Sequence, residues 1–181
     1  LDQQIRTLHT NTTIRDHMLE IHDRFKGIFS GSSTRLDLKE TFMGDNLIKL
    51  LKDLKSISSV TQLNLSDNEI TDIEDLLENK GLNQLTLLDL GNNDIKKIPS
   101  SLTNLTNLTT LDLSFNPLEL QSIAQVLESE KSPPLKELRL NNIPPYLKEE
   151  TPRLLANALQ DLTDELNTVL TAHRPNGPFG A

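Results

Sequence analysis

Val60-Thr-Gln-Leu63-Asn-Leu65-Ser-Asp-Asn68-Glu-Ile70 is the stretch that decides the fold, because the same pattern returns at residues 85–95 and 108–118. In each copy apolar residues occupy positions 1, 4, 6 and 11, and asparagine occupies position 9. Side chains alternate between the two faces of a strand, so positions 4 and 6 point inward while positions 3, 5 and 7 point toward solvent. Each copy therefore predicts one short strand of a sheet.

The spacing LxxLxLxxNxL resembles the consensus of the leucine-rich-repeat family, and the resemblance covers residues 33–143. One repeat cannot bury its own apolar face, so neighbouring repeats must stack. The resemblance implies an α/β fold: a right-handed solenoid with a parallel concave sheet of about five strands and a helical cap at each end. Asn68, Asn93 and Asn116 are expected to close the turn after each strand by bonding backbone groups.

The remaining repeats are less regular. A weaker copy begins at Ser33, with Leu36 and Leu38 at positions 4 and 6 and Thr41 in place of asparagine. Helical periodicity follows it over residues 47–54 and returns over 120–127, which predicts helices on the convex side, similar to the ribonuclease-inhibitor style of repeat. The repeat containing Pro99 resembles the short typical form, whose convex side is irregular or 3₁₀, because proline interrupts a helix interior.

We predict three segments: an N-terminal helical cap (1–31), the repeats (32–143), and a C-terminal helical cap with a tail (144–181). Thr13 and Asp16 resemble a capping box, and we expect the helix to end at Gly31. The alternative role of the first segment is a partner-binding helix with exposed phenylalanines. The expected buried face of that first helix comprises Ile14, Met18, Ile21, Phe25 and Phe29.

Composition excludes several classes of function. The net charge of -8 argues against a general affinity for nucleic acid or for an anionic membrane. The chain has no cysteine, which removes disulfides, thiolate zinc sites and cysteine nucleophiles and favours a reducing compartment or a bacterial origin. No apolar run is long enough to span a membrane. The chain begins at Leu1, so we expect that a signal or a further domain has been removed.

Motifs of catalysis are missing from the sequence, so we predict no enzyme activity, no cofactor and no metal. His17 and His22 are five residues apart, which places them about 140° apart around a helix rather than on one face.

The concave face is the candidate site, and its residues form columns down the sheet. The position-5 column is acidic at its centre, and like charges on neighbouring strands are mildly destabilising, so we predict a surface kept for a protein partner with a basic patch. We expect Asp89 and Asp112 to point to solvent, so that their replacement by lysine leaves the fold unchanged. Phe115 is either an anchor for the partner or packs beside the asparagines. The predicted partner-binding residues are Arg35, Asp37, Lys39, Gln62, Asn64, Ser66, Leu87, Asp89, Thr110, Asp112, Phe115, Glu137 and Arg139, and position 7 continues through Gly91, Ser114 and Asn141.

The sequence therefore predicts a non-enzymatic protein-binding module. Its cysteine-free caps and mixed repeat lengths resemble the leucine-rich-repeat effectors that bacterial pathogens inject into host cells, which implies a cytoplasmic or host-cell location. One alternative is the substrate-recognition half of a larger enzyme. Another is an adaptor that presents its end helices and leaves the concave face unused.

Overall fold

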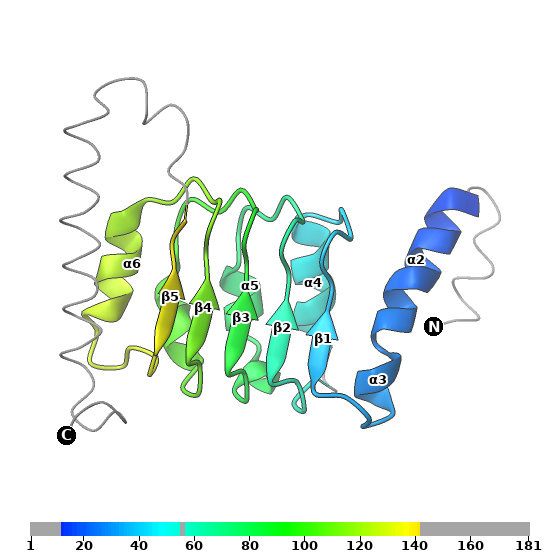
Figure 1. The fold of residues 1–181 in the computed structure, drawn as a ribbon, viewed down its shortest axis with the longest axis horizontal. Coiled ribbons are helices and arrows are strands. Elements are labelled where there is room, and N and C mark those ends of the chain that lie inside the picture. Colours follow the sequence, from blue (N-terminus) through cyan, green and yellow to red (C-terminus); the bar gives the residue numbers. More distant parts are fainter. Residues whose placement is uncertain (1–11, 55–56, 142–181) are drawn as a thin grey trace.

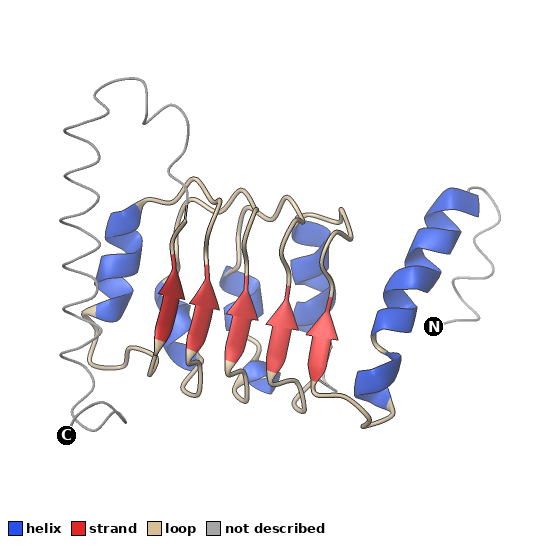
Figure 2. Cartoon of the chain, in the orientation of Figure 1, coloured by secondary structure: helices blue, strands red, loops and turns tan. Residues whose placement is uncertain are grey.

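Five parallel strands form one side of the molecule, and helices cover the other side (Figures 1 and 2). In the computed structural model residues 12–54 and 57–141 are described, so the predicted C-terminal cap lies outside the described residues. The spatial order of the strands equals their order in the chain, so each repeat stacks directly on the one before it. The predicted α/β solenoid with a parallel sheet is confirmed. Its strands are β1 (Arg35–Asp37), β2 (Gln62–Asn64), β3 (Leu87–Asp89), β4 (Thr110–Asp112) and β5 (Glu137–Arg139).

The leucines at positions 4 and 6 form the core behind the sheet. Leu63 pairs with Leu88 and Leu88 with Leu111, and all three side chains are at most 1% exposed. The leucines two residues further on, Leu65 and Leu90, are fully buried. Side chains two residues apart along a strand point to the same face, so positions 4 and 6 of a repeat are buried together. The predicted register of the central repeats is therefore confirmed.

The convex side changes from repeat to repeat, as predicted. It comprises α4 (Asp45–Asp53), α5 (Glu74–Leu77) with the 3₁₀ turn η1 (Lys80–Leu82), the 3₁₀ turn η2 (Ser100–Asn104), and α6 (Leu120–Leu127). The longest of these, α4, buries Leu47, Ile48 and Leu51 along one face. In the shorter repeat, Pro99 adopts an extended backbone (φ −72°, ψ 154°) immediately before η2 and so limits this side to a 3₁₀ turn.

The N-terminal segment forms two helices, α2 (Thr12–Arg24) and α3 (Lys26–Phe29), beside β1 at the first edge of the sheet (Figure 1). The expected apolar face is confirmed in part, because Ile21 and Phe25 are buried and Met18 packs against the core. Ile28 is also buried, whereas Phe29, whose ring stacks on Phe25, is 52% exposed and Ile14, at the other end, is 53% exposed. Phe25 itself is 4% exposed, whereas the alternative of a partner-binding helix needs it exposed.

Two hydrogen bonds connect α2 to the first repeat. His17 Nε2 donates to the carbonyl oxygen of Thr41 at 2.6 Å, and Arg24 donates to the carbonyl oxygen of Lys39 at 2.6 Å. Thr13 lies within α2, whose first residue, Thr12, borders the residues outside the described ranges, so the capping box stays a prediction. Gly31 ends α3 with a φ of +73°, a left-handed conformation that glycine adopts at little cost. The capping role of this segment stays a prediction.

The described residues contain neither a membrane-spanning helix nor a cluster of metal ligands. Over the part of the chain that the structure describes, no helix has the length and apolar character needed to cross a bilayer. Over the same residues, no group of three or more histidine, aspartate or glutamate side chains is placed to hold a metal ion.

Candidate functional site

The concave columns exist as the sequence predicts. Along position 5, Asp37 pairs with Asn64, Asn64 with Asp89, and Asp89 with Asp112, in consecutive parallel strands. Arg139 completes this column on β5. The position-3 column aligns in the same way and contains Arg35, Gln62, Leu87, Thr110 and Glu137.

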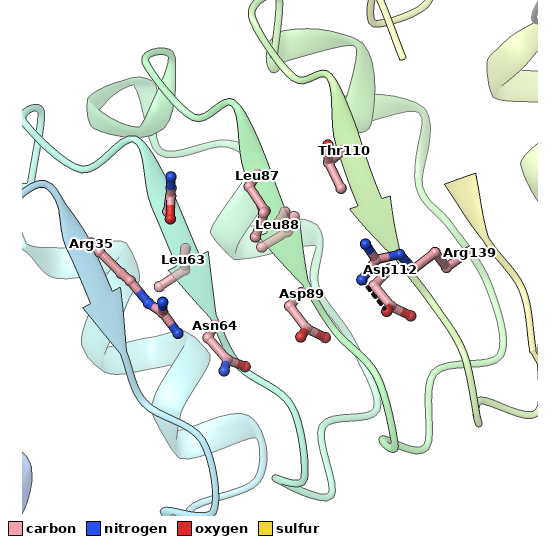
Figure 3. A pocket seen from close by; sticks show the side chains of 10 residues that line it. Arg35, Leu63, Asn64, Leu87, Leu88, Asp89, Thr110, Asp112 and Arg139 are labelled. Atoms are coloured by element: carbon pink, nitrogen blue, oxygen red, sulfur yellow. Dashed lines mark ion pairs between the residues drawn. The ribbon is translucent and has the colours of Figure 1, made fainter. Parts of the chain in front are cut away.

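A shallow hollow of about 150 Å³ lies in the middle of this face (Figure 3). Pockets for drug-sized ligands usually hold roughly 300 to 1,000 Å³, so this hollow is small for an enclosed small molecule. Its shape suits contact with the surface of another macromolecule. The hollow is lined by Arg35, Gln62, Leu63, Asn64, Leu87, Leu88, Asp89, Thr110, Asp112 and Arg139.

The position-5 side chains also hold the backbone together, which the sequence analysis missed. The Oδ1 atom of Asp89 accepts a hydrogen bond from the backbone N–H of Gly91 at 2.9 Å, two residues further on. The same bond forms from Lys39 to Asp37 (3.1 Å), from Ser66 to Asn64 (3.0 Å) and from Ser114 to Asp112 (2.9 Å). A side-chain oxygen therefore satisfies the position-7 N–H in each of four successive repeats, β1 to β4, and this explains why aspartate and asparagine recur at position 5.

This bond corrects two expectations. Asp89 and Asp112 do not simply point to solvent, and the side chain of Asp112 is only 17% exposed. At position 7, Ser66 and Ser114 are 7% and 5% exposed, so they present little surface to a partner. Lysine lacks an acceptor, so a lysine at residue 89 would leave the Gly91 N–H without this hydrogen bond, and the reason for expecting an unchanged fold does not hold.

Intramolecular ion pairs neutralise the two ends of the face. Arg139 lies 2.7 Å from Glu137 and 3.5 Å from Asp112, and Arg35 lies 3.5 Å from Asp37. Asp89 makes no ion pair with any residue in the described ranges, although the Arg139 guanidinium is near enough to act on it electrostatically. The predicted acidic centre is thus concentrated at Asp89.

Burial raises the pKa of the Asp89 carboxyl above its ordinary value, and the negative charges of Asp112 and Asp67 add to this effect. The Gly91 N–H bond and the charge of Arg139 act in the opposite direction without reversing it. The ionised form of Asp89 is therefore less favourable in the folded chain than in the unfolded chain.

We expect a pH dependence from this shift. A raised carboxyl pKa means that the folded chain holds the proton to a higher pH than the unfolded chain, whose Asp pKa is about 3.9. Stability therefore falls as pH rises from the unfolded pKa through the folded pKa, and the deficit persists at neutral pH. Asp89→Asn keeps an acceptor but does not ionise, so the difference in unfolding free energy, mutant minus wild type, should increase between about pH 3 and pH 7. Urea titrations across that range measure it, and a constant or decreasing difference would count against the raised pKa.

The asparagines of position 9 form the predicted ladder beside the sheet. Asn93 Oδ1 accepts the backbone N–H groups of Asn68 and Ile70, both in the preceding repeat. Its Nδ2 donates to the carbonyl oxygens of Leu65, Leu90 and Gly91. The asparagine therefore joins two successive repeats as well as closing its own turn.

The loops that follow the strands hold two exposed aromatic residues. Position 8 has a positive φ in four repeats, at Glu40, Asp67, Asn92 and Phe115. Aspartate and asparagine tolerate this conformation, but the glutamate and the phenylalanine give no such signal in the sequence. Phe115 is 53% exposed, which favours the anchor interpretation over packing beside the asparagines, and Phe42 is 69% exposed.

Comparison with known proteins agrees with this geometry. A family model described as "Leucine rich repeat" matches residues 58–118. The chain is 39% identical over 69 residues to the volume-regulated anion channel subunit LRRC8D of Rattus norvegicus and 34% identical over 74 residues to subunit LRRC8A of Homo sapiens. These matches cover 38% and 41% of this chain but only 8% and 9% of those proteins.

Among solved structures, an internalin (inlF) from Listeria monocytogenes is 32% identical, with a TM-score of 0.39, and the match covers 51% of this chain and 25% of that one. The family match, the parallel five-stranded sheet and the asparagine ladder identify the repeats together. Residues 58–118 of this chain are leucine-rich repeats.

Proposed function

We propose that this chain is a non-enzymatic module that binds a basic segment of a protein partner through its concave face. Leucine-rich-repeat domains generally mediate protein–protein interaction, because stacked repeats present an extended concave surface. The observation that carries the proposal is Asp89, a half-buried carboxylate at the centre of the hollow without an ion pair among the described residues.

The negative charge of Asp89 is unfavourable in the folded chain, and its hydrogen bond to the backbone does not require that charge. Asn64 makes the same bond to the position-7 N–H as Asp89 does, without a charge. A neutral asparagine would therefore satisfy the backbone equally well at residue 89. The raised pKa of Asp89 shows that its ionised form is disfavoured by folding. A cationic group from a partner would offset that penalty on binding.

The experiment replaces Asp89 and Asp112 by asparagine in one variant, because Asn64 shows that asparagine keeps the backbone hydrogen bond. The partner is first recovered by pull-down with the wild-type chain and identified by mass spectrometry. We expect the double variant to bind it at least about tenfold more weakly, since truncating one side of a desolvated charge pair costs roughly 2 kcal/mol or more. Association should slow, and the wild-type affinity should fall with added salt.

A matched control removes the same net charge from elsewhere. Asp53→Asn with Glu128→Gln changes two exposed carboxylates at the ends of α4 and α6. This control should bind as tightly as wild type. Equal binding by wild type, the concave variant and the control would sink the proposal, provided that all three melt at similar temperatures. Asp89→Lys is a poor test because lysine also removes the acceptor for the Gly91 N–H.

The location of the protein is a further part of the proposal. We propose that it acts in a reducing compartment, as a bacterial effector that modulates a host or bacterial protein. The cysteine-free composition supports this location. Recovery of a cytosolic partner in the pull-down would agree with it, and recovery of an extracellular one would contradict it.

A further inference from the structure

A second groove lies on the loops that follow the strands, apart from the concave hollow. It holds about 290 Å³ and draws its lining from three consecutive repeats. No residue of this rim groove also lines the concave hollow. The rim groove is lined by Glu40, Phe42, Asp67, Glu69, Asn92, Asn93 and Asp94.

Phe42 gives the rim groove an aromatic wall. Its ring is 69% exposed, although the adjacent Met43 packs against the core. Phe42 has a φ of +53°, a left-handed conformation that is uncommon for a phenylalanine. Large aromatic side chains are normally buried because each removes 150 to 250 Å², as an order of magnitude, from water. An exposed ring in a groove is available to a partner.

The charges of the rim groove select the kind of partner. Its four ionisable side chains are all acidic: Glu40, Asp67, Glu69 and Asp94. Lys39 lies 3.8 Å from Glu40 and 3.5 Å from Asp67. In the described portion of the chain no ion pair involves Glu69 or Asp94, which are both exposed. A cation entering beside Phe42 would thus meet unpaired carboxylates.

We propose that the rim groove binds an arginine side chain from a basic segment of a protein partner, with the guanidinium stacked on Phe42 and facing the carboxylates of Glu69 and Asp94. Arginine suits this groove better than lysine, because its planar guanidinium both stacks on aromatic rings and forms paired hydrogen bonds with carboxylates. The inference rests on the proposed function in that the ligand belongs to a protein. It adds a second contact surface with its own selectivity.

The experiment uses two short capped peptides of equal length and charge, one of arginine and glycine and the other of lysine and glycine. Their dissociation constants with the whole chain are measured by fluorescence anisotropy at low salt. Wild type should bind the arginine peptide up to about two- to fivefold more tightly than the lysine peptide, because the planar guanidinium stacks on the ring better than an ammonium group does and the whole of an exposed cation–π contact is worth about that factor. Phe42→Leu keeps an apolar side chain without an aromatic face, so it should remove this preference.

Phe115→Leu is the matched control. Phe115 is exposed and has a positive φ like Phe42, but it does not line the rim groove, so the arginine preference should persist in this variant. Glu69→Gln with Asp94→Asn should weaken both peptides. In NMR spectra, the arginine peptide should shift the amide signals of residues 67–69 and 92–94.

Each remaining outcome decides against the rim groove. Equal affinity for the two peptides in wild type, or a preference that survives in Phe42→Leu, would overturn the inference. Loss of the preference in Phe115→Leu would place the contact elsewhere. The variant with asparagine at 89 and 112 separates the two proposals: it should keep the peptide preference of the rim groove, while its binding of the captured partner reports on the concave face.

Discussion

Leu90→Ala should lower the unfolding free energy by about 2 to 5 kcal/mol, the usual cost of a large-to-small change in a packed core. Leu90 is fully buried, in the middle of the stack, with Leu65 and Leu113 at the same position of the neighbouring repeats. The repeats on both sides hold the cavity open, so the site has little freedom to collapse.

Leu87→Ala is the matched control, because Leu87 lies in the same repeat, three residues before Leu90, with its side chain half-buried on the concave face. Leu87→Ala should lower the unfolding free energy by clearly less, because folding buries less apolar surface at residue 87. Urea denaturation of both variants measures the difference. Equal losses of unfolding free energy would contradict the assignment of Leu90 to the buried face and of Leu87 to the concave face.

Asn93→Ala should cost about 2 to 6 kcal/mol, because it leaves two buried backbone N–H groups, those of Asn68 and Ile70, without their acceptor at about 1 to 3 kcal/mol each. The carbonyl oxygens of Leu65 and Leu90, which accept hydrogen bonds from Asn93 Nδ2, lose that donor as well. Because the bonds cross between repeats, the variant should also make unfolding less cooperative along the stack.

The control for this prediction is Asn46→Ala. Asn46 is exposed in α4 and alanine is a good helix former, so the change should stay within about 0.5 kcal/mol. Asn92 is the obvious control from the sequence, but it has a φ of +52° and its side chain donates to Asp67. A loss at Asn93 no larger than that at Asn46 would show that the ladder does not support the stack.

The sequence predicts the repeat core because burial imposes a strict period on it. Leu63, Leu88 and Leu111 recur at one position of a short pattern, and only one register buries all of them. The asparagine ladder follows for a similar reason, since a buried amide must find partners. Even the change from the α4 helix to the η2 turn can be inferred from Pro99.

The roles of exposed positions follow less directly. The sequence spacing of a position-5 carboxylate is the same whether it faces a partner or accepts a backbone N–H of its own chain. Asp89 accepts the Gly91 N–H and is still available to a partner. The sequence does not show that Ile28 rather than Phe29 is buried, because both lie within about one turn of Phe25. Phe42 precedes Met43, which points inward. The exposure of Phe42 depends on its positive φ, which cannot be predicted from the residue type.

Site-specific cross-linking tests most directly whether the concave face binds the partner. A photoreactive amino acid is placed either at Gln62, exposed on β2 of the concave face, or at Gln121, exposed on α6 of the convex side. Both positions carry the same native residue, so the two variants are closely matched. We predict a covalent product with the captured partner from position 62 and none from position 121. A product from position 121 alone would contradict binding through the concave face.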